Sequence, residues 1–248
     1  MDIKEKTVLI TGSASGLGAA TARELSKRGA KIILLDKNIS QAEKIAAEIH
    51  AKAFECDVTS ENSVKNIISQ CGEIHAAINC AGIIHGARIV GKNGAMPLDD
   101  FSRVIQINLI GTFNVLRLVA EKMSTQKILN EVGERGVIIN TASIAAFEGQ
   151  LGQIAYSASK GGVAAMTLPA ARELSKFGIR VMTIAPGVMQ TPMVSGMTEE
   201  VQKQLSADVP FPKQLGDSKN YGELCAHIIE NNYLNGSVIR LDGALRLR

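Results

Sequence analysis

The chain has 248 residues, of which 46% are hydrophobic and 21% charged, and its net charge is only +3. This length and apolar content suit one large α/β domain with a sizeable core, and they exclude a disordered chain. No basic run with interleaved aromatic residues is present, so we expect no nucleic-acid partner. We find no apolar stretch of the roughly 20 residues that a membrane-spanning helix needs, and therefore expect no membrane partner.

Short apolar runs alternate along the chain with segments of helical period. We expect seven β-strands, at residues 6–12, 30–36, 53–58, 75–82, 136–143, 179–187 and 237–243. We expect helices at residues 17–29, 40–50 and 100–123, and around Tyr156. The helix around Tyr156 contains Pro169, which should kink or interrupt it. The polar, glycine-containing residues 84–98 should form a loop.

Strands made of continuous apolar runs, each followed by a helix, are typical of a parallel sheet covered on both faces. No repeat, linker or low-complexity segment divides the chain. The sequence therefore predicts a doubly wound, seven-stranded parallel α/β sheet (a Rossmann fold) in a single domain, residues 1–248. Residues 188–216 follow the sixth strand and contain methionines, prolines and small residues. We expect them to form a lid over a substrate.

The four cysteines lie neither in a Cys-x-x-Cys pair nor at metal-ligand spacing from a histidine. We interpret them as ordinary reduced thiols and expect no metal site; they are Cys56, Cys71, Cys80 and Cys225. The first six residues lead directly into the first expected strand, which leaves no room for a signal or transit peptide. A cytoplasmic protein is the resulting expectation.

Three glycines, Gly12, Gly16 and Gly18, lie between the first expected strand and the first expected helix. In this context glycine lets the backbone approach a pyrophosphate, and the helix N-terminus offers free N–H groups and the positive end of a dipole. The alternative is a glycine-rich turn that holds no ligand. The strand–turn–helix context favours a dinucleotide.

The second expected strand ends at Asp36, 18 residues after Gly18. A carboxylate there can accept hydrogen bonds from both hydroxyls of the adenosine ribose and would repel a 2′-phosphate. Lys37 could reach such a phosphate, but we interpret it as a solvated side chain, and Ser15 adds no second cation to the glycine loop. The sequence therefore favours NAD over NADP.

Several motifs follow one another in order along nearly the whole chain. They are the glycine run, Asn-Cys-Ala-Gly at residues 79–82, Asn108, Ser143, Tyr156-x-x-x-Lys160 and Pro186-Gly187. With these motifs the chain resembles the short-chain dehydrogenase/reductase family. Residues 135–162, 178–187, 209–217 and 235–246 further resemble one subgroup, the type 2 3-hydroxyacyl-CoA dehydrogenases, also called 17β-hydroxysteroid dehydrogenases type 10. Members of that subgroup use NAD(H) on 3-hydroxyacyl-CoA and, more loosely, on hydroxysteroids, and family members usually form tetramers.

Tyr156 and Lys160 are four residues apart, so on a helix they share one face. A free tyrosine has a pKa near 10, too high for a base at neutral pH. Because an ammonium and a positively charged nicotinamide both favour the phenolate, we expect Lys160 to lower the pKa of Tyr156. Tyr156 would then exchange a proton with the substrate oxygen, and Ser143 would hydrogen-bond the same oxygen. The alternative is a buried tyrosine whose hydroxyl is merely hydrogen-bonded, with Lys160 on the surface.

The resemblance also implies the cofactor contacts. Asp57 and Val58 should meet the adenine, Thr191 the carboxamide, and Lys160 the nicotinamide ribose. Asn108, expected as a fourth catalytic residue, should bend its helix around a water that links Lys160 to solvent. The residues expected to bind NAD are Gly12, Ser15, Gly16, Leu17, Gly18, Asp36, Asp57, Val58, Asn79, Ala81, Gly82, Tyr156, Lys160, Pro186, Val188 and Thr191. Asp57 has an alternative role as a helix N-cap partner.

Three hypotheses for the function follow. The first is an NAD-dependent 3-hydroxyacyl-CoA dehydrogenase. The second keeps this chemistry but acts on a hydroxysteroid, another secondary alcohol or a 3-oxoacyl carrier protein. Asp36 argues against the carrier-protein reductases, which usually prefer NADPH. The third is a non-catalytic NAD-binding scaffold, against which the complete set of catalytic motifs weighs.

Overall fold

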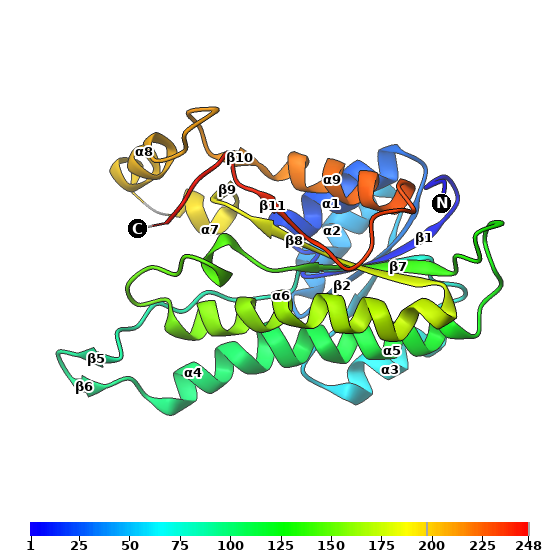
Figure 1. Ribbon diagram of the computed structural model, residues 1–248, viewed down its shortest axis with the longest axis horizontal. Coiled ribbons are helices and arrows are strands. Elements are labelled where there is room, and N and C mark those ends of the chain that lie inside the picture. The colour runs from blue at the N-terminus through cyan, green and yellow to red at the C-terminus, as the bar shows by residue number, and fades with distance from the viewer. Residues whose placement is uncertain (197, 248) are drawn as a thin grey trace.

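Seven parallel strands form one sheet in the computed structural model, which describes residues 1–196 and 198–247 (Figure 1). The strands are β1 (Thr7–Thr11), β2 (Lys31–Asp36), β3 (Lys52–Glu55), β4 (Ala76–Asn79), β7 (Gly136–Thr141), β8 (Ile179–Pro186) and β11 (Val238–Leu241). Their order in the sheet is β11-β8-β7-β4-β1-β2-β3. The predicted doubly wound, seven-stranded parallel sheet is confirmed.

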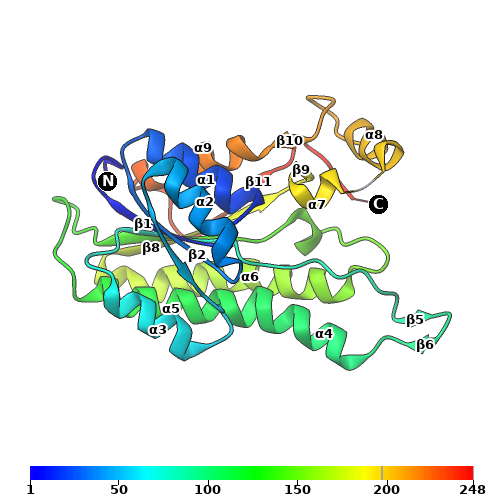
Figure 2. The same ribbon diagram turned by 180° about the vertical axis from the view of Figure 1, so that it is seen from behind.

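Helices cover both faces of the sheet (Figures 1 and 2). One face carries α1 (Gly16–Lys27), α2 (Ile39–Ile49) and α9 (Ser218–Glu230); the other carries α3 (Glu61–Gln70), α4 (Leu98–Ile105), α5 (Thr112–Ser124) and α6 (Ile154–Leu174). Successive side chains of a strand point to opposite faces. Val8 and Ile10 of β1 accordingly pack into the core beside α1 and α9, and Leu9 packs into the core beside α3 and α5.

The expected long helix runs without interruption from residue 98 to residue 124. A π-helical turn, η1 (Gln106–Gly111), joins α4 to α5 and contains Asn108. The resulting 27-residue helix is long and apolar enough to cross a membrane by length and composition, contrary to our expectation from the sequence. In its most apolar window, 56% of the helix is buried in the fold, and core helices of this kind pass the same test.

Helix α6 continues through Pro169, so the expected break is absent. A proline removes the N–H that would bond the carbonyl four residues earlier, which here is that of Ala165. Ala165 and Pro169 are both exposed. Water can therefore take the place of the missing donor.

Two segments at the same end of the molecule lie outside the sheet layers (Figure 1). Residues 84–97 are irregular except for a small projecting hairpin, β5 (Val90–Gly91) with β6 (Gly94–Ala95), and residue 98 of the expected loop already begins α4. The expected lid, residues 188–216, contains β9 (Met189–Gln190), α7 (Pro192–Ser195) and α8 (Glu199–Ala207), and its end pairs with β9 as β10 (Gly216–Asp217). Met197 lies outside the described residues. Two 3-10 turns complete the fold, η2 (Ile144–Ala146) and η3 (Ser175–Phe177).

Candidate active site

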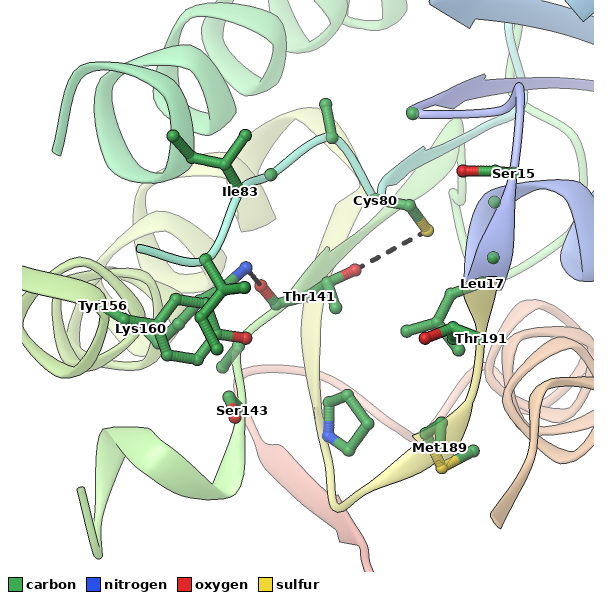
Figure 3. Close-up of a pocket in the computed structure, with 18 of the residues that line it drawn as sticks. Ser15, Leu17, Cys80, Ile83, Thr141, Ser143, Tyr156, Lys160, Met189 and Thr191 are labelled. Carbon is green, nitrogen blue, oxygen red and sulfur yellow. Dashed lines mark hydrogen bonds between the residues drawn. The ribbon is translucent and has the colours of Figure 1, made fainter. Parts of the chain in front are cut away.

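A cavity of about 540 Å³ opens at the carboxyl ends of the parallel strands. The direction in which successive strands are added to the sheet reverses between β1 and β4. β2 and β3 extend the sheet on one side of β1, and β4, β7, β8 and β11 extend it on the other. In open α/β sheets, ligands bind at such a switch point. Strand ends, the start of residues 84–98, α6 and residues 188–216 contribute the walls (Figure 3).

The glycine loop forms one end of the cavity. Gly12 has φ +64°, and a Cβ there would lie 2.6 Å from the backbone nitrogen of Ala81. A Cβ on Gly18 would overlap the carbonyl oxygen of Gly12. Gly16 has φ +52° and, within 4 Å of its Cβ position, faces only the side chain of Thr191, at 3.6 Å. At Gly12 and Gly18 the loop thus packs closely against main chain, whereas at Gly16 there is free space beside the backbone. This arrangement fits a pyrophosphate.

Helix α1 begins at this loop without a side-chain cap. Its N-cap residue Ser15 is extended and makes no capping hydrogen bond. The first N–H groups of a helix have no partner inside the helix, so here they are available to an anion. Ser15, Gly16, Leu17 and Gly18 all line the cavity, as expected.

Asp36, at the end of β2, lines the cavity beside this loop. Its Oδ2 accepts a hydrogen bond from the backbone N–H of Ala14 at 2.9 Å, and its Oδ1 accepts one from that of Asn38 at 2.8 Å. These two bonds hold the carboxylate in one orientation and leave it further acceptor capacity for ribose hydroxyls. The donor set therefore fits the adenosine half of NAD.

Asp57 lies across from Asp36 and also lines the cavity. Its pKa is lowered, first by the hydrogen bond from the Thr59 hydroxyl and also by Lys37. Lys37 Nζ lies 3.0 Å from Asp57 Oδ2, so Lys37 is paired as well as exposed, where we expected a freely solvated side chain. Asp57 does not cap α3, because Ser60 accepts the capping hydrogen bond.

Two of the predicted site residues, Asn79 and Asn108, lie outside the cavity wall. Asn79 is buried at the end of β4, and its Nδ2 donates to Oδ1 of Asn140 on β7 at 2.9 Å. The side chain therefore joins two strands and does not reach the cofactor cavity. Asn108 Oδ1 accepts from the Ile83 N–H at 2.8 Å, and its Nδ2 donates to the Ile83 carbonyl and the Ser159 hydroxyl. It anchors the π-helical turn to α6 and to the chain after Gly82.

Three of the four expected catalytic side chains, those of Ser143, Tyr156 and Lys160, lie close together on one side of the cavity (Figure 3). Ser143 follows β7 and caps η2, where its hydroxyl accepts from the Ala145 N–H at 3.1 Å. Tyr156 and Lys160 lie one turn apart on α6. Lys160 is 5% exposed, and its Nζ donates to the Thr141 carbonyl at 2.8 Å. The same Nζ stands 5.8 Å from the centroid of the Tyr156 ring.

Burial dominates the pKa values of this pair. It lowers the pKa of Lys160 to about 8. It also raises the pKa of Tyr156 above the usual range, and the Ser143 hydroxyl offsets only part of that increase. The expected lowering of the Tyr156 pKa by Lys160 is absent, because the ammonium is directed at the Thr141 carbonyl and not at the phenol oxygen. Burial of the phenol therefore favours its protonated form.

Comparison with known proteins agrees with this geometry. Residues 6–202 match the family model described as short chain dehydrogenase. The chain belongs to the short-chain dehydrogenase family. It is accordingly an oxidoreductase that uses NAD to interconvert a CH–OH group and a ketone.

Several relatives of this short-chain dehydrogenase are similar over their whole length. It is 51% identical to "3-hydroxyacyl-CoA dehydrogenase type-2" of Bos taurus, over 99% of this chain and 97% of that protein. It is 48% identical to the Drosophila melanogaster protein of the same name, over 99% of both chains. The crystal structure of 3-hydroxyacyl-CoA dehydrogenase type-2 from Mycobacterium avium superposes with a TM-score of 0.93 at 40% identity, covering 98% of this chain and 96% of that one. The resemblance noted in the sequence is confirmed.

Several residues that line the cavity were not singled out from the sequence, and two of them, Thr141 and Leu247, bear on the chemistry proposed below. Thr141 lies two residues before Ser143, and its carbonyl holds Lys160. Its hydroxyl donates to the Asn79 carbonyl at 2.6 Å and lies 2.7 Å from the hydroxyl of buried Tyr221. The polar position at a strand end was the available signal for Thr141. Leu247 also lines the cavity, and no local sequence signal points to it.

Across residues 1–196 and 198–247, no group of three or more His, Cys, Asp or Glu side chains is placed to hold a metal ion. All four cysteines are free thiols, and Cys80 lines the cavity. The arrangement that remains is an acid–base pair, a hydroxyl donor and a dinucleotide loop.

Proposed function

We propose that this protein interconverts 3-hydroxyacyl-CoA and 3-oxoacyl-CoA with NAD. The observation that carries the proposal is the placement of Ser143, Tyr156 and Lys160 between the glycine loop and an apolar end of one cavity. The apolar side chains of Val194 and Leu205, both in the lid, line the cavity and can cover an acyl chain. The names of the relatives at 48% and 51% identity support the substrate.

NAD, when bound, supplies the hydride acceptor or donor. Ser143 donates a hydrogen bond to the reacting oxygen of the substrate and stabilises charge that develops on it. Tyr156 gives its proton to that oxygen when a ketone is reduced and takes a proton from it when an alcohol is oxidised. The nearby charge of Lys160 stabilises the phenolate that remains after proton donation.

A hydroxysteroid or another apolar secondary alcohol is the second candidate substrate. The same apolar walls support it, and the chemistry is unchanged. A 3-oxoacyl carrier protein is less well supported, because Asp36 is held at the place where a 2′-phosphate would lie. The complete catalytic set weighs against a non-catalytic scaffold.

We also propose that the protein is a homotetramer in the cytoplasm. Ile110 and Phe113, on one side of the long helix, are 43% and 50% exposed, and Leu168 on α6 is 44% exposed. Exposed apolar side chains on the helices of one face of the sheet would be covered in an oligomer. Four reduced cysteines support a reducing compartment. Light scattering of the purified protein would measure the size of the assembly.

The function is tested by following NADH consumption with acetoacetyl-CoA, and then repeating the assay with NADPH. Fast turnover with NADH and slow turnover with NADPH would support both the substrate and the role of Asp36. No turnover despite NADH binding would contradict the acyl-CoA proposal and direct the assay to hydroxysteroids and small secondary alcohols. Equal rates with both cofactors would contradict the role of Asp36.

A further inference from the structure

A short segment after β11 forms part of the cavity wall. In this segment, residues 242–247, the side chain of Leu247 lines the cavity and Leu245 is 3% exposed. Leu245 packs in one apolar cluster with Ile144, which directly follows Ser143, and with Val209 of the lid. Leu247 packs against the same cluster. The segment therefore touches both the catalytic loop and the lid.

An arginine on β11 fixes this segment to the loop that carries Ser143. The two terminal nitrogens of Arg240 donate to the two carboxylate oxygens of Glu148 at 2.8 and 2.9 Å. Its Nε donates to Asp242 Oδ2 at 2.6 Å, and its Nη2 also donates to the Leu245 carbonyl at 3.1 Å. A two-pronged guanidinium–carboxylate pair fixes orientation as well as distance. The Arg240 guanidinium thus sets the position of residues 242–247 relative to the catalytic loop.

A tight turn directs the segment back toward the cavity. Gly243 and Ala244 are both left-handed, with φ +58° and +66°. Asp242 Oδ1 accepts from the Ala244 N–H at 2.9 Å and so holds the alanine in a conformation that it rarely adopts. A Cβ on Gly243 would lie 2.6 Å from Val209 Cγ1. The turn is therefore built to press against the lid and to return Leu245 and Leu247 to the site.

We propose that Leu247 determines substrate specificity by contacting the acyl chain, and that Arg240 is the positioning residue that holds it there. This inference rests on the proposed function. Leu247 presents an apolar side chain to the cavity, and the neighbouring walls from Ile144 and Val188 are apolar too. Such a wall matches the alkyl part of a substrate and not the phosphates of CoA. Leu247 packs against the cluster that joins Ile144 of the Ser143 loop to Val209 of the lid, so it lies where the far carbons of an acyl chain would pass.

The experiment compares kcat/KM for 3-oxoacyl-CoA substrates of four, eight and twelve carbons, with NADH, in the wild type, Leu247→Trp and Leu247→Ala. Leu247→Trp should lower the twelve-carbon value relative to the four-carbon value by about tenfold or more, because one methylene of misfit in an apolar pocket already has that effect. Leu247→Ala should shift the preference toward longer chains. The matched control is Ile128→Trp. Ile128 is 55% exposed and precedes β7, so it lies toward the amino ends of the strands, away from the cavity at their carboxyl ends.

Arg240→Gln tests the positioning role. It should raise KM for the twelve-carbon substrate more than KM for acetoacetyl-CoA while the Kd for NADH stays within about twofold, and Arg240→Lys should restore part of the loss because one donor can still reach Glu148. A purely structural role would change NADH binding and all substrates together.

Different results would contradict this inference and the proposed function. Parallel chain-length profiles for the wild type and Leu247→Trp would overturn the inference and leave the proposed function standing. A wild type that binds NADH but turns over none of the acyl-CoA substrates would overturn the proposed function, and this inference with it.

Discussion

The cavity is built differently at its two ends. At the cofactor end, main chain forms the wall: Gly12 packs against Ala81, the first turn of α1 is uncapped, and two backbone N–H groups hold Asp36. At the substrate end, the wall consists of side chains from segments outside the sheet, residues 188–216 and 242–247. Main chain at the end of a buried sheet has little freedom, whereas an apolar side chain can be exchanged without disturbing the fold. Cofactor affinity and substrate preference should therefore be separable by mutation.

Tyr156 lies between the two ends, and Tyr156→Phe should have the largest effect on turnover. It removes the only proton donor that we assign to the substrate oxygen, so kcat should fall by about 10² to 10⁴. Both walls stay intact, and NADH titrated by fluorescence should bind as it does to the wild type. Retained turnover would remove Tyr156 from this role, and lost NADH binding would mean that the phenol also builds the cofactor end.

Asp36→Ala should act on the cofactor end alone. Loss of charge-assisted hydrogen bonds costs about 1.5–3 kcal/mol, so kcat/KM for NADH should fall by at least about tenfold, while that for NADPH should fall less or rise. KM for acetoacetyl-CoA should not change. Steady-state kinetics with each cofactor varied would measure this, and an unchanged cofactor ratio would show that another group sets the preference.

Substitutions at two glycines distinguish the cost of backbone strain from the cost of close packing. Gly133 has φ +84° and no atom of the described residues within 4 Å of its Cβ position, whereas Gly12 combines φ +64° with the contact to Ala81. Gly133→Ala should therefore lower the free energy of unfolding by about 1 kcal/mol and leave NADH binding unchanged. Gly12→Ala should lower it by about 2 kcal/mol or more and weaken NADH. Urea denaturation and NADH titration test both, and equal effects would mean that the Ala81 contact is not tight.

The smallest expected effect is the pH dependence of kcat/KM for NADH. The pKa of Lys160 is lowered to about 8, so its ammonium loses its proton at lower pH than an ordinary lysine does. If Lys160 binds the nicotinamide ribose, as the family resemblance implies, kcat/KM for NADH should decrease as pH rises through about 8. This parameter reports groups of the free enzyme. A profile from pH 6 to 10 that stays flat across pH 8 would show that the charge of Lys160 does not contribute to NADH binding.

The same difference between the two ends explains what the sequence could predict. Strands, glycine turns and Asp36 are local signals, because a few neighbouring residues determine strand ends and tight turns. The spacing of Tyr156 and Lys160 placed both on one helix face but could not show that the ammonium faces the Thr141 carbonyl. Likewise, strand period predicts where Asn79 lies along β4 and not its pairing with Asn140.

The substrate end depends on residues that are distant in the chain. Arg240 meets Glu148, and Leu245 meets Ile144, only after β11 has paired with β8. No periodicity or motif in one sequence reports such contacts. The family resemblance implied a bend at Asn108, but the side-chain pattern does not reveal the π-helical turn there, because one wide turn is lost within a long apolar helix.

The strand order also links cofactor binding to the fraction of chains that are folded. β1 and β4 are neighbours in the sheet, although β2 and β3 lie between them in the sequence. Bringing them together requires closing a long loop, so the crevice between their ends exists only in molecules whose two halves have joined. A dinucleotide held across that crevice binds the joined state alone and stabilises it by mass action. The fraction of chains open to proteolysis should therefore fall as the concentration of free dinucleotide rises.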